Sequence, residues 1–254
     1  MDVDLCFEGE LARIRVEGKN GVQVFSADAR VRLANVLAEL EQAADCRVVV
    51  FEAEGRTFIA GADIKELQQL DYESGLAIAR AGQRLMQRIA NLNAVTVAAV
   101  NAACAGGGCE LALACDLRLA AESAVIGLPE VKLGLIPGWG GTARAVRLFG
   151  SAVAKRMILS GELLSAADAA RLGIVDAVIA DVEFRDAVDH RVEQLLVGGP
   201  HALAAAKRLI AEFEGGDIES QLEAEAEAFA RCCDNEESTE GATAFLEKRP
   251  PQWS

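Results

Sequence analysis

Residues 101–116, NAACAGGGCELALACD, place three consecutive glycines after an apolar run and a glutamate, Glu110, before the apolar letters LALA. Three glycines after a buried strand let the backbone approach a ligand closely. They also leave backbone N–H groups free at the start of the next helix, where the helix dipole favours negative charge. The segment therefore predicts a buried strand, a glycine turn and a helix, and it raises the question of why a glutamate lies in apolar company.

The glycine turn has more than one interpretation on its own. A phosphate cradle is one, although the Walker lysine–serine pair and the GxGxxG spacing are both absent from the sequence. An oxyanion site, in which N–H groups stabilise charge that develops during a reaction, is a second. A tight strand-to-helix turn without any ligand is the third.

Strand and helix patterns alternate along the rest of the chain. Residues 47–53 (RVVVFEA) and 94–102 (AVTVAAVNA) are continuous apolar runs, typical of strands that are buried on both faces. Residues 26–43 have apolar side chains at helical spacing. Short strands are expected over 3–9, 11–18 and 21–26, and a short strand pair with a turn over 117–131. This alternation predicts an α/β fold with a largely parallel sheet covered by helices, followed by a helical tail.

A second loop, RTFIAGADIKEL at residues 56–67, has the same pattern of a glycine turn between a strand and a helix. Gly61 and Ala62 lie between a buried strand and a helix that begins near Asp63. Open α/β folds bind ligands at the carboxyl ends of their strands. Both loops are therefore expected to contribute to one ligand site.

Composition and charge exclude several classes of protein. The net charge of −14 argues against a nucleic-acid binder, and no apolar run is long enough for a membrane span. Seven cysteines, with an odd count and no zinc-like spacing, favour reduced thiols and a cytoplasmic protein without a metal. The acidic start resembles neither a signal nor a transit peptide. His190 and His201 lie in the helical tail, away from both loops, which argues against a Ser-His-Asp protease.

Three stretches resemble the crotonase superfamily, and enoyl-CoA hydratases most closely: FIAGADIKEL (58–67), the run 100–120 and GLPEVKLGLIPGWGGTARAVRLFG (127–150). The similarity extends from about Val48 to AFLEKRPPQW near the end of the chain. It implies a spiral of ββα units in residues 1–195. It also implies a helical region in residues 196–254 that forms trimer contacts and completes the CoA site. A homotrimer or a dimer of trimers is expected.

The resemblance also implies the catalytic groups. The backbone N–H groups of Ala62 and Gly107 match the family's oxyanion hole, and Glu110 and Glu130 match its two catalytic glutamates. Glu110 is then expected to activate water and Glu130 to donate a proton to the α-carbon. No metal and no cofactor are implied beyond the coenzyme A of the substrate. Without the resemblance, Glu110 could serve the helix dipole alone, and Glu130 could be an exposed turn residue.

The expected substrate site contains further residues. The resemblance assigns cations to CoA phosphates and loop backbone to the adenine, with two C-terminal residues from a neighbouring subunit. The residues expected to bind the acyl-CoA are Arg56, Ala60, Gly61, Ala62, Asp63, Ile64, Lys65, Gly106, Gly107, Trp139, Phe245 and Lys248. Each cation could equally be a solvated surface charge. Trp139 replaces a small residue of many hydratases and either narrows the acyl pocket or packs beneath its loop.

The function expected from these residues is hydration of trans-2-enoyl-CoA to 3-hydroxyacyl-CoA. Double-bond isomerisation, thioester hydrolysis and carbon–carbon cleavage are alternatives, because the same oxyanion hole serves them. The presence of both glutamates favours hydration over isomerisation. It also makes an acyl-CoA-binding protein without catalytic activity the less favoured alternative.

Overall fold

The structure is a computed structural model that describes residues 1–213 and 217–253. Its core contains a six-stranded sheet, in which β1 and β2 pair antiparallel and every other neighbouring pair is parallel. In spatial order the strands are β1 (Asp2–Glu8), β2 (Leu11–Glu17), β3 (Val48–Ala53), β5 (Val95–Val100), β7 (Leu117–Ala121) and β10 (Ala177–Ile179). The expected buried strands are confirmed as β3 and β5, which lie in the middle of this sheet.

A second sheet consists of four short strands, and the sequence patterns indicate only the third of them, within the strand pair expected over residues 117–131. They are β4 (Thr57–Ile59), β6 (Ala103–Ala105), β8 (Val125–Gly127) and β9 (Leu164–Ser165). Three of them follow a strand of the large sheet directly: β4 follows β3, β6 follows β5, and β8 follows β7. Each successive unit thus gives one strand to each sheet before its helix, and this is the spiral of ββα units that the resemblance implied.

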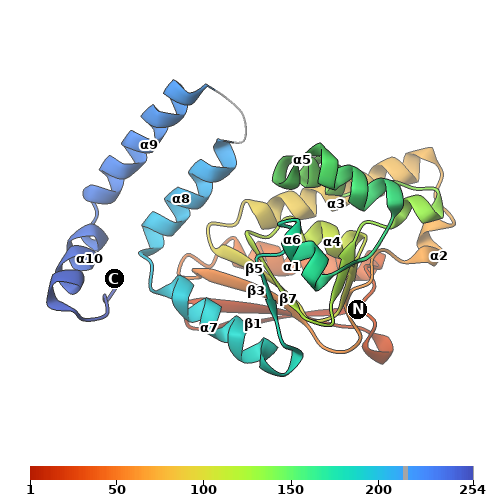
Figure 1. Cartoon of the computed structure of the whole chain (residues 1–254), viewed down its shortest axis with the longest axis horizontal. Coiled ribbons are helices and arrows are strands. Elements are labelled where there is room, and N and C mark those ends of the chain that lie inside the picture. The colour runs from red at the N-terminus through yellow and green to blue at the C-terminus, as the bar shows by residue number, and fades with distance from the viewer. Residues whose placement is uncertain (214–216, 254) are drawn as a thin grey trace.

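Helices cover both faces of the large sheet (Figure 1). On one face, α7 (Phe184–Leu196) places Val188 and Val192 against apolar residues of β2, β3, β5 and β7. The larger apolar core lies on the opposite face and includes residues of α1 (Ala27–Leu40), α3 (Tyr72–Ala90), α4 (Gly107–Ala112), α5 (Gly141–Ser160) and α6 (Ala166–Arg171). The apolar runs of β3 and β5 are explained by this burial on two faces.

Local chemistry sets where these helices begin and bend. The Ser26 hydroxyl accepts the Ala29 N–H at the start of α1, and Asp71 and Ser74 form a reciprocal capping box at the start of α3. Gly150, with φ of 77° and ψ of 166°, interrupts α5. The turn before α1 differs from the expectation, because residues 21–26 make a single bridge, between Phe25 and Ala62, in place of a strand.

The last three helices extend away from the two sheets (Figure 1). They are α8 (Pro200–Glu212), α9 (Ile218–Cys233) and α10 (Glu236–Glu247). Lys207 on α8 contacts the Asp116 carboxylate at 2.7 Å and donates to the Ala94 carbonyl at 2.8 Å. Glu237 of α10 accepts the backbone N–H of His201, which ties α10 to the start of α8. None of the described helices combines the length and the apolar character that crossing a bilayer requires.

Candidate active site

Two glycine turns meet where β4 and β6 of the small sheet end. Gly61 follows β4 with φ of 112°, and Gly106 follows β6 with φ of 53°, a backbone region that strongly favours glycine. A Cβ on Gly106 would lie 3.7 Å from the Gly61 Cα, and a Cβ on Gly61 would lie 3.2 Å from the Ala105 carbonyl oxygen. The two loops quoted from the sequence are therefore in direct contact.

Each turn leaves one backbone N–H group without a backbone acceptor among residues 1–213 and 217–253. Phe25 donates its N–H to the Gly61 carbonyl at 2.9 Å, whereas the N–H of the next residue, Ala62, meets no backbone acceptor in the described residues. Gly107 is the first residue of α4, where helix geometry provides no acceptor for its N–H. Ala62 and Gly107 are the two residues to which the resemblance assigned the oxyanion hole.

Each of the three adjacent glycines, Gly106, Gly107 and Gly108, is required for a different structural reason. Gly106 has a positive φ, whereas a Cβ on Gly107 would lie 2.7 Å from Cζ3 of Trp139. A Cβ on Gly108 would lie 2.2 Å from the Ile59 carbonyl oxygen, so this glycine allows α4 to pack closely on β4. The sequence suggested close approach to a ligand for the run as a whole, and only the packing separates the three roles.

Glu110 is buried in the first turn of α4, with 2% of its surface exposed. Its Oε1 accepts the backbone N–H groups of Trp139 at 2.7 Å and of Gly141 at 2.8 Å. Burial raises the pKa of the Glu110 carboxyl, while these two hydrogen bonds and the charge of Arg144 oppose the rise. The donors belong to the segment PGWGG, where the sequence predicted Trp139 as a substrate-site residue but not that the backbone N–H groups of Trp139 and Gly141 hold Glu110. The closely spaced glycines of this segment are the signal that could have indicated these contacts.

Gly141 has a specific part in this arrangement. A Cβ at Gly141 would lie 2.9 Å from the Cγ of Glu110 and 3.0 Å from its Oε1. Only a glycine therefore lets the start of α5 approach the carboxylate closely enough to donate its N–H.

Glu130 approaches the same turn from the short 3-10 helix Glu130–Leu133 that follows β8. A Cβ on Gly106 would lie 3.4 Å from the Oε1 of Glu130. The Oε2 of Glu130 is buried and has no hydrogen-bond partner within the described part of the chain. Burial, with a further contribution from the charge of Glu110, raises the pKa of Glu130 to about 7. The structure thus brings both predicted glutamates to the glycine turns.

The residues expected to bind CoA form two separate groups. Arg56 and Lys65 are exposed at the first loop, where Arg56 donates to the Asn20 carbonyl and Asp63 caps the short helix α2 (Ile64–Leu67). Ala60 donates its N–H to the Gln23 carbonyl at 2.8 Å, and Ile64 is half exposed. Phe245 and Lys248 belong to the end of α10, at the opposite end of the molecule from α2 (Figure 1). One chain therefore does not bring these two groups together.

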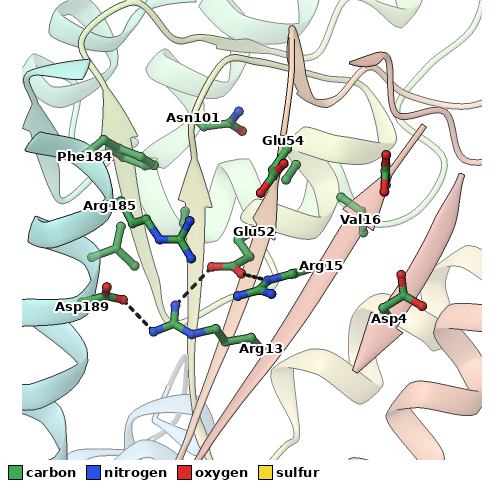
Figure 2. A pocket seen from close by; sticks show the side chains of 14 residues that line it. Asp4, Arg13, Arg15, Val16, Glu52, Glu54, Asn101, Phe184, Arg185 and Asp189 are labelled. Carbon is green, nitrogen blue, oxygen red and sulfur yellow. Dashed lines mark hydrogen bonds and ion pairs between the residues drawn. The ribbon is translucent and has the colours of Figure 1, made fainter. Parts of the chain in front are cut away.

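A separate cavity of about 240 Å³ lies between the sheet and α7, and none of the predicted site residues lines it. Figure 2 shows its charged side chains, with Arg13 directed towards both Glu52 and Asp189. Arg13 contacts Glu8 at 3.1 Å, Glu52 at 3.1 Å and Asp189 at 2.6 Å. Because Asp189 belongs to α7, this ion network attaches the helix to β2 and β3.

The spiral of two sheets and its glycine turns define a protein of the crotonase fold. The chain belongs to the enoyl-CoA hydratase/isomerase family, whose model matches residues 7–254.

Individual relatives agree with this membership. A probable enoyl-CoA hydratase from Bacillus subtilis is 40% identical over 223 residues, which cover 87% of this chain and 86% of the relative. A short-chain-enoyl-CoA hydratase from Clostridium acetobutylicum is 32% identical over 243 residues, which cover 95% of this chain and 93% of the relative. Among solved structures, an enoyl-CoA hydratase from Bacillus anthracis superposes with a TM-score of 0.94 at 32% identity, covering 100% of this chain and 99% of that one.

Proposed function

We propose that this protein hydrates trans-2-enoyl-CoA to 3-hydroxyacyl-CoA. The proposal rests on one observation: two carboxyl groups with different hydrogen bonding lie near two backbone N–H groups that have no backbone acceptor in the described residues. Glu110 receives two backbone hydrogen bonds, Glu130 has a buried oxygen without a partner in the described chain, and Ala62 and Gly107 supply the N–H groups. Family membership and relatives named enoyl-CoA hydratase support the same reaction class.

The proposed role of the two N–H groups is to bind the thioester carbonyl oxygen. Hydrogen bonds from Ala62 and Gly107 draw electron density towards that oxygen and make the β-carbon electrophilic. They also stabilise the enolate-like transition state, whose charge grows on the same oxygen. The protein therefore needs no metal and no cofactor for this step beyond the CoA that the substrate carries.

The proposed division of labour between the carboxyl groups follows from their surroundings. Burial raises the pKa of Glu110, but the two N–H groups that it accepts oppose this rise, so we assign Glu110 the role of removing a proton from water as the oxygen adds to the β-carbon. Glu130, whose pKa is about 7, retains a proton near neutral pH and delivers it to the α-carbon. Glu110 then carries the extra proton, and one transfer through water returns it to Glu130.

The CoA moiety is proposed to bind between subunits. Phe245 is 83% exposed and Leu246 is 80% exposed on α10, and this helix lies far from its own first loop (Figure 1). A homotrimer, alone or paired into a dimer of trimers, would place α10 of one subunit beside Arg56 and Lys65 of another. The predicted division at residue 196 then separates the catalytic core from the region that completes the site. The seven unpaired cysteines agree with a cytoplasmic protein.

The test of the function is the loss of enoyl-thioester absorbance when the purified protein is mixed with crotonyl-CoA. Identification of 3-hydroxybutyryl-CoA as the product would support hydration. Binding without any conversion of several enoyl-CoA esters would contradict the proposal, and a shifted double bond or free CoA would indicate isomerisation or hydrolysis instead.

A further inference from the structure

The indole ring of Trp139 lies directly behind the site and is almost fully buried, with 4% of the residue exposed. Its ring meets Phe25 edge to face, with ring centroids 5.3 Å apart and an interplanar angle of 75°. The Arg30 guanidinium carbon lies 6.0 Å from the centroid of the indole. Arg30 is itself held by the Glu66 carboxylate at 3.0 Å and the Phe25 carbonyl at 3.1 Å. The ring is therefore fixed by its neighbours and does not hang freely into the site.

Two glycines make room for this ring on opposite edges. A Cβ on Gly82 of α3 would lie 2.1 Å from Cδ1 and 2.3 Å from Nε1, so the pyrrole edge rests on the bare backbone of that helix. A Cβ on Gly107 would lie 2.7 Å from Cζ3, so the benzene edge rests on one of the two residues assigned to the oxyanion hole. The indole therefore fills the space between α3 and the first turn of α4.

The position of the ring relative to the chemistry follows from two contacts. The benzene edge touches Gly107, where the proposed thioester oxygen binds, and the backbone N–H of Trp139 itself holds Glu110. A substrate whose carbonyl lies at Gly107 and whose β-carbon faces Glu110 would therefore direct its remaining carbons towards the indole.

Trp139 also lines a groove of about 750 Å³ between α3, α5 and α8. Its aliphatic lining includes Leu113, Leu148, Leu195, Leu203 and Ile210. The indole thus lies at the boundary between the catalytic residues and an apolar groove.

We propose that the Trp139 indole is the stop that limits this enzyme to short acyl chains. The inference rests on the proposed function, because it takes the acyl-CoA to lie with its thioester oxygen at Gly107. Crotonyl has a single methyl group beyond its β-carbon and fits in front of the ring. A longer enoyl chain meets an indole that its contacts with Gly82 and Phe25 hold in place.

The experiment compares kcat/KM for four-, six- and eight-carbon enoyl-CoA esters in the wild type and in Trp139→Ala. A single misfitting methylene group already changes kcat/KM by roughly 10–200-fold. We therefore expect the wild type to prefer crotonyl-CoA over the eight-carbon ester at least tenfold, and Trp139→Ala to reduce that preference at least tenfold. The backbone N–H of residue 139 survives the substitution, so Glu110 keeps its donor.

Two further variants keep the test decisive if Trp139→Ala is unstable. Trp139→Phe retains an aromatic ring against Phe25 and should shift the preference in the same direction by a smaller factor. Trp253→Ala removes the other tryptophan, which packs on Gly241 of α10, and should leave the chain-length ratio unchanged. Equal wild-type rates on short and long esters, or an unchanged ratio in both folded Trp139 variants, would overturn the proposal.

A binding measurement separates this inference from the proposed function. Calorimetric titration with butyryl-CoA and octanoyl-CoA reports the fit of the acyl chain without requiring any turnover. Tighter binding of butyryl-CoA in the wild type, reduced or reversed in Trp139→Ala, would support the stop even if no hydration were detected. Octanoyl-CoA binding as tight as butyryl-CoA binding in the wild type would refute it even in an active hydratase.

Discussion

Glu110 and Glu130 approach the same glycine turn, yet the protein surrounds their carboxyl groups in opposite ways. Glu110 belongs to a helix and offers one oxygen to two backbone N–H groups. Glu130 begins a short 3-10 turn and keeps one buried oxygen without a partner in the described residues. Burial raises the pKa of both carboxyl groups, but two backbone N–H groups oppose the rise at Glu110, whereas the buried Oε2 of Glu130 has no such donor in the described residues.

The largest expected effect comes from removing either acid. Glu110→Gln and Glu130→Gln should each lower kcat on crotonyl-CoA by roughly 10²–10⁴-fold, the usual contribution of a general acid or base. Glutamine retains an oxygen that can accept the N–H groups of Trp139 and Gly141, so Glu110→Gln should fold normally. Steady-state kinetics measures the effect, with Glu122→Gln on the surface as the matched control. Near-normal turnover in either variant would remove that glutamate from the mechanism.

The second prediction disturbs only the surroundings of Glu110. Gly141→Ala places a methyl group 2.9 Å from the Glu110 Cγ, so the carboxylate or the start of α5 must move. A displacement of about 1 Å near the reacting groups can cost about 10²-fold in rate, and we expect a loss of that order in kcat. Gly75→Ala on α3, where the added methyl group meets nothing within 4 Å, is the control and should retain full activity. Equal activity of the two variants would contradict the proposed role of the Gly141 N–H.

The third prediction concerns stability and does not depend on the reaction. The pKa of Glu130 rises from 4.5 in the unfolded chain to about 7 in the folded one, so the native state binds the proton more tightly. The free energy of unfolding should therefore fall as the pH rises from about 4.5 to 7, and the loss should be complete above pH 7. Glu130→Gln avoids this loss and should be more stable than the wild type at pH 8 by up to about 3 kcal/mol.

Denaturant unfolding at pH 5 and pH 8 measures this difference. The advantage of Glu130→Gln should shrink towards pH 5, where the wild-type carboxyl is protonated in the native state. An advantage of the same size at both pH values would show that the substitution acts through packing and not through the proton.

The smallest expected effect is the pH dependence of the wild-type rate. Because Glu130 must be protonated to act as the acid, kcat/KM should fall above pH 7, approaching tenfold per pH unit. Glu130→Gln has no titrating group at this position, so its residual rate should lack this alkaline decline. Stopped or steady-state assays from pH 6 to 9 measure both profiles, and an identical decline in the variant would assign the titration to another group.

The sequence predicted the large sheet and both glycine loops because their signals are local. The apolar runs that became β3 and β5 are long and continuous, and turn glycines mark where each ends. The predicted strand over residues 21–26 was wrong, since its pattern is too short to compete with the turn that pairs only Phe25 with Ala62. Apart from β8, the strands of the small sheet were not predicted, because they have only two or three residues each, too few to show a periodicity.

The sequence alone predicted the fold class, because strand and helix periods are properties of neighbouring residues, and its resemblance to the hydratases supplied the two candidate glutamates. Only the tertiary structure decided how each carboxyl group behaves, since the N–H groups that hold Glu110 lie about 30 residues away in the chain. It also decided the place of Trp139, because a pattern of single residues cannot show that Gly82 and Gly107 leave room for one indole between them. Burial and hydrogen bonding depend on segments that only folding brings together, and these two quantities are the basis for the different roles proposed for the two glutamates.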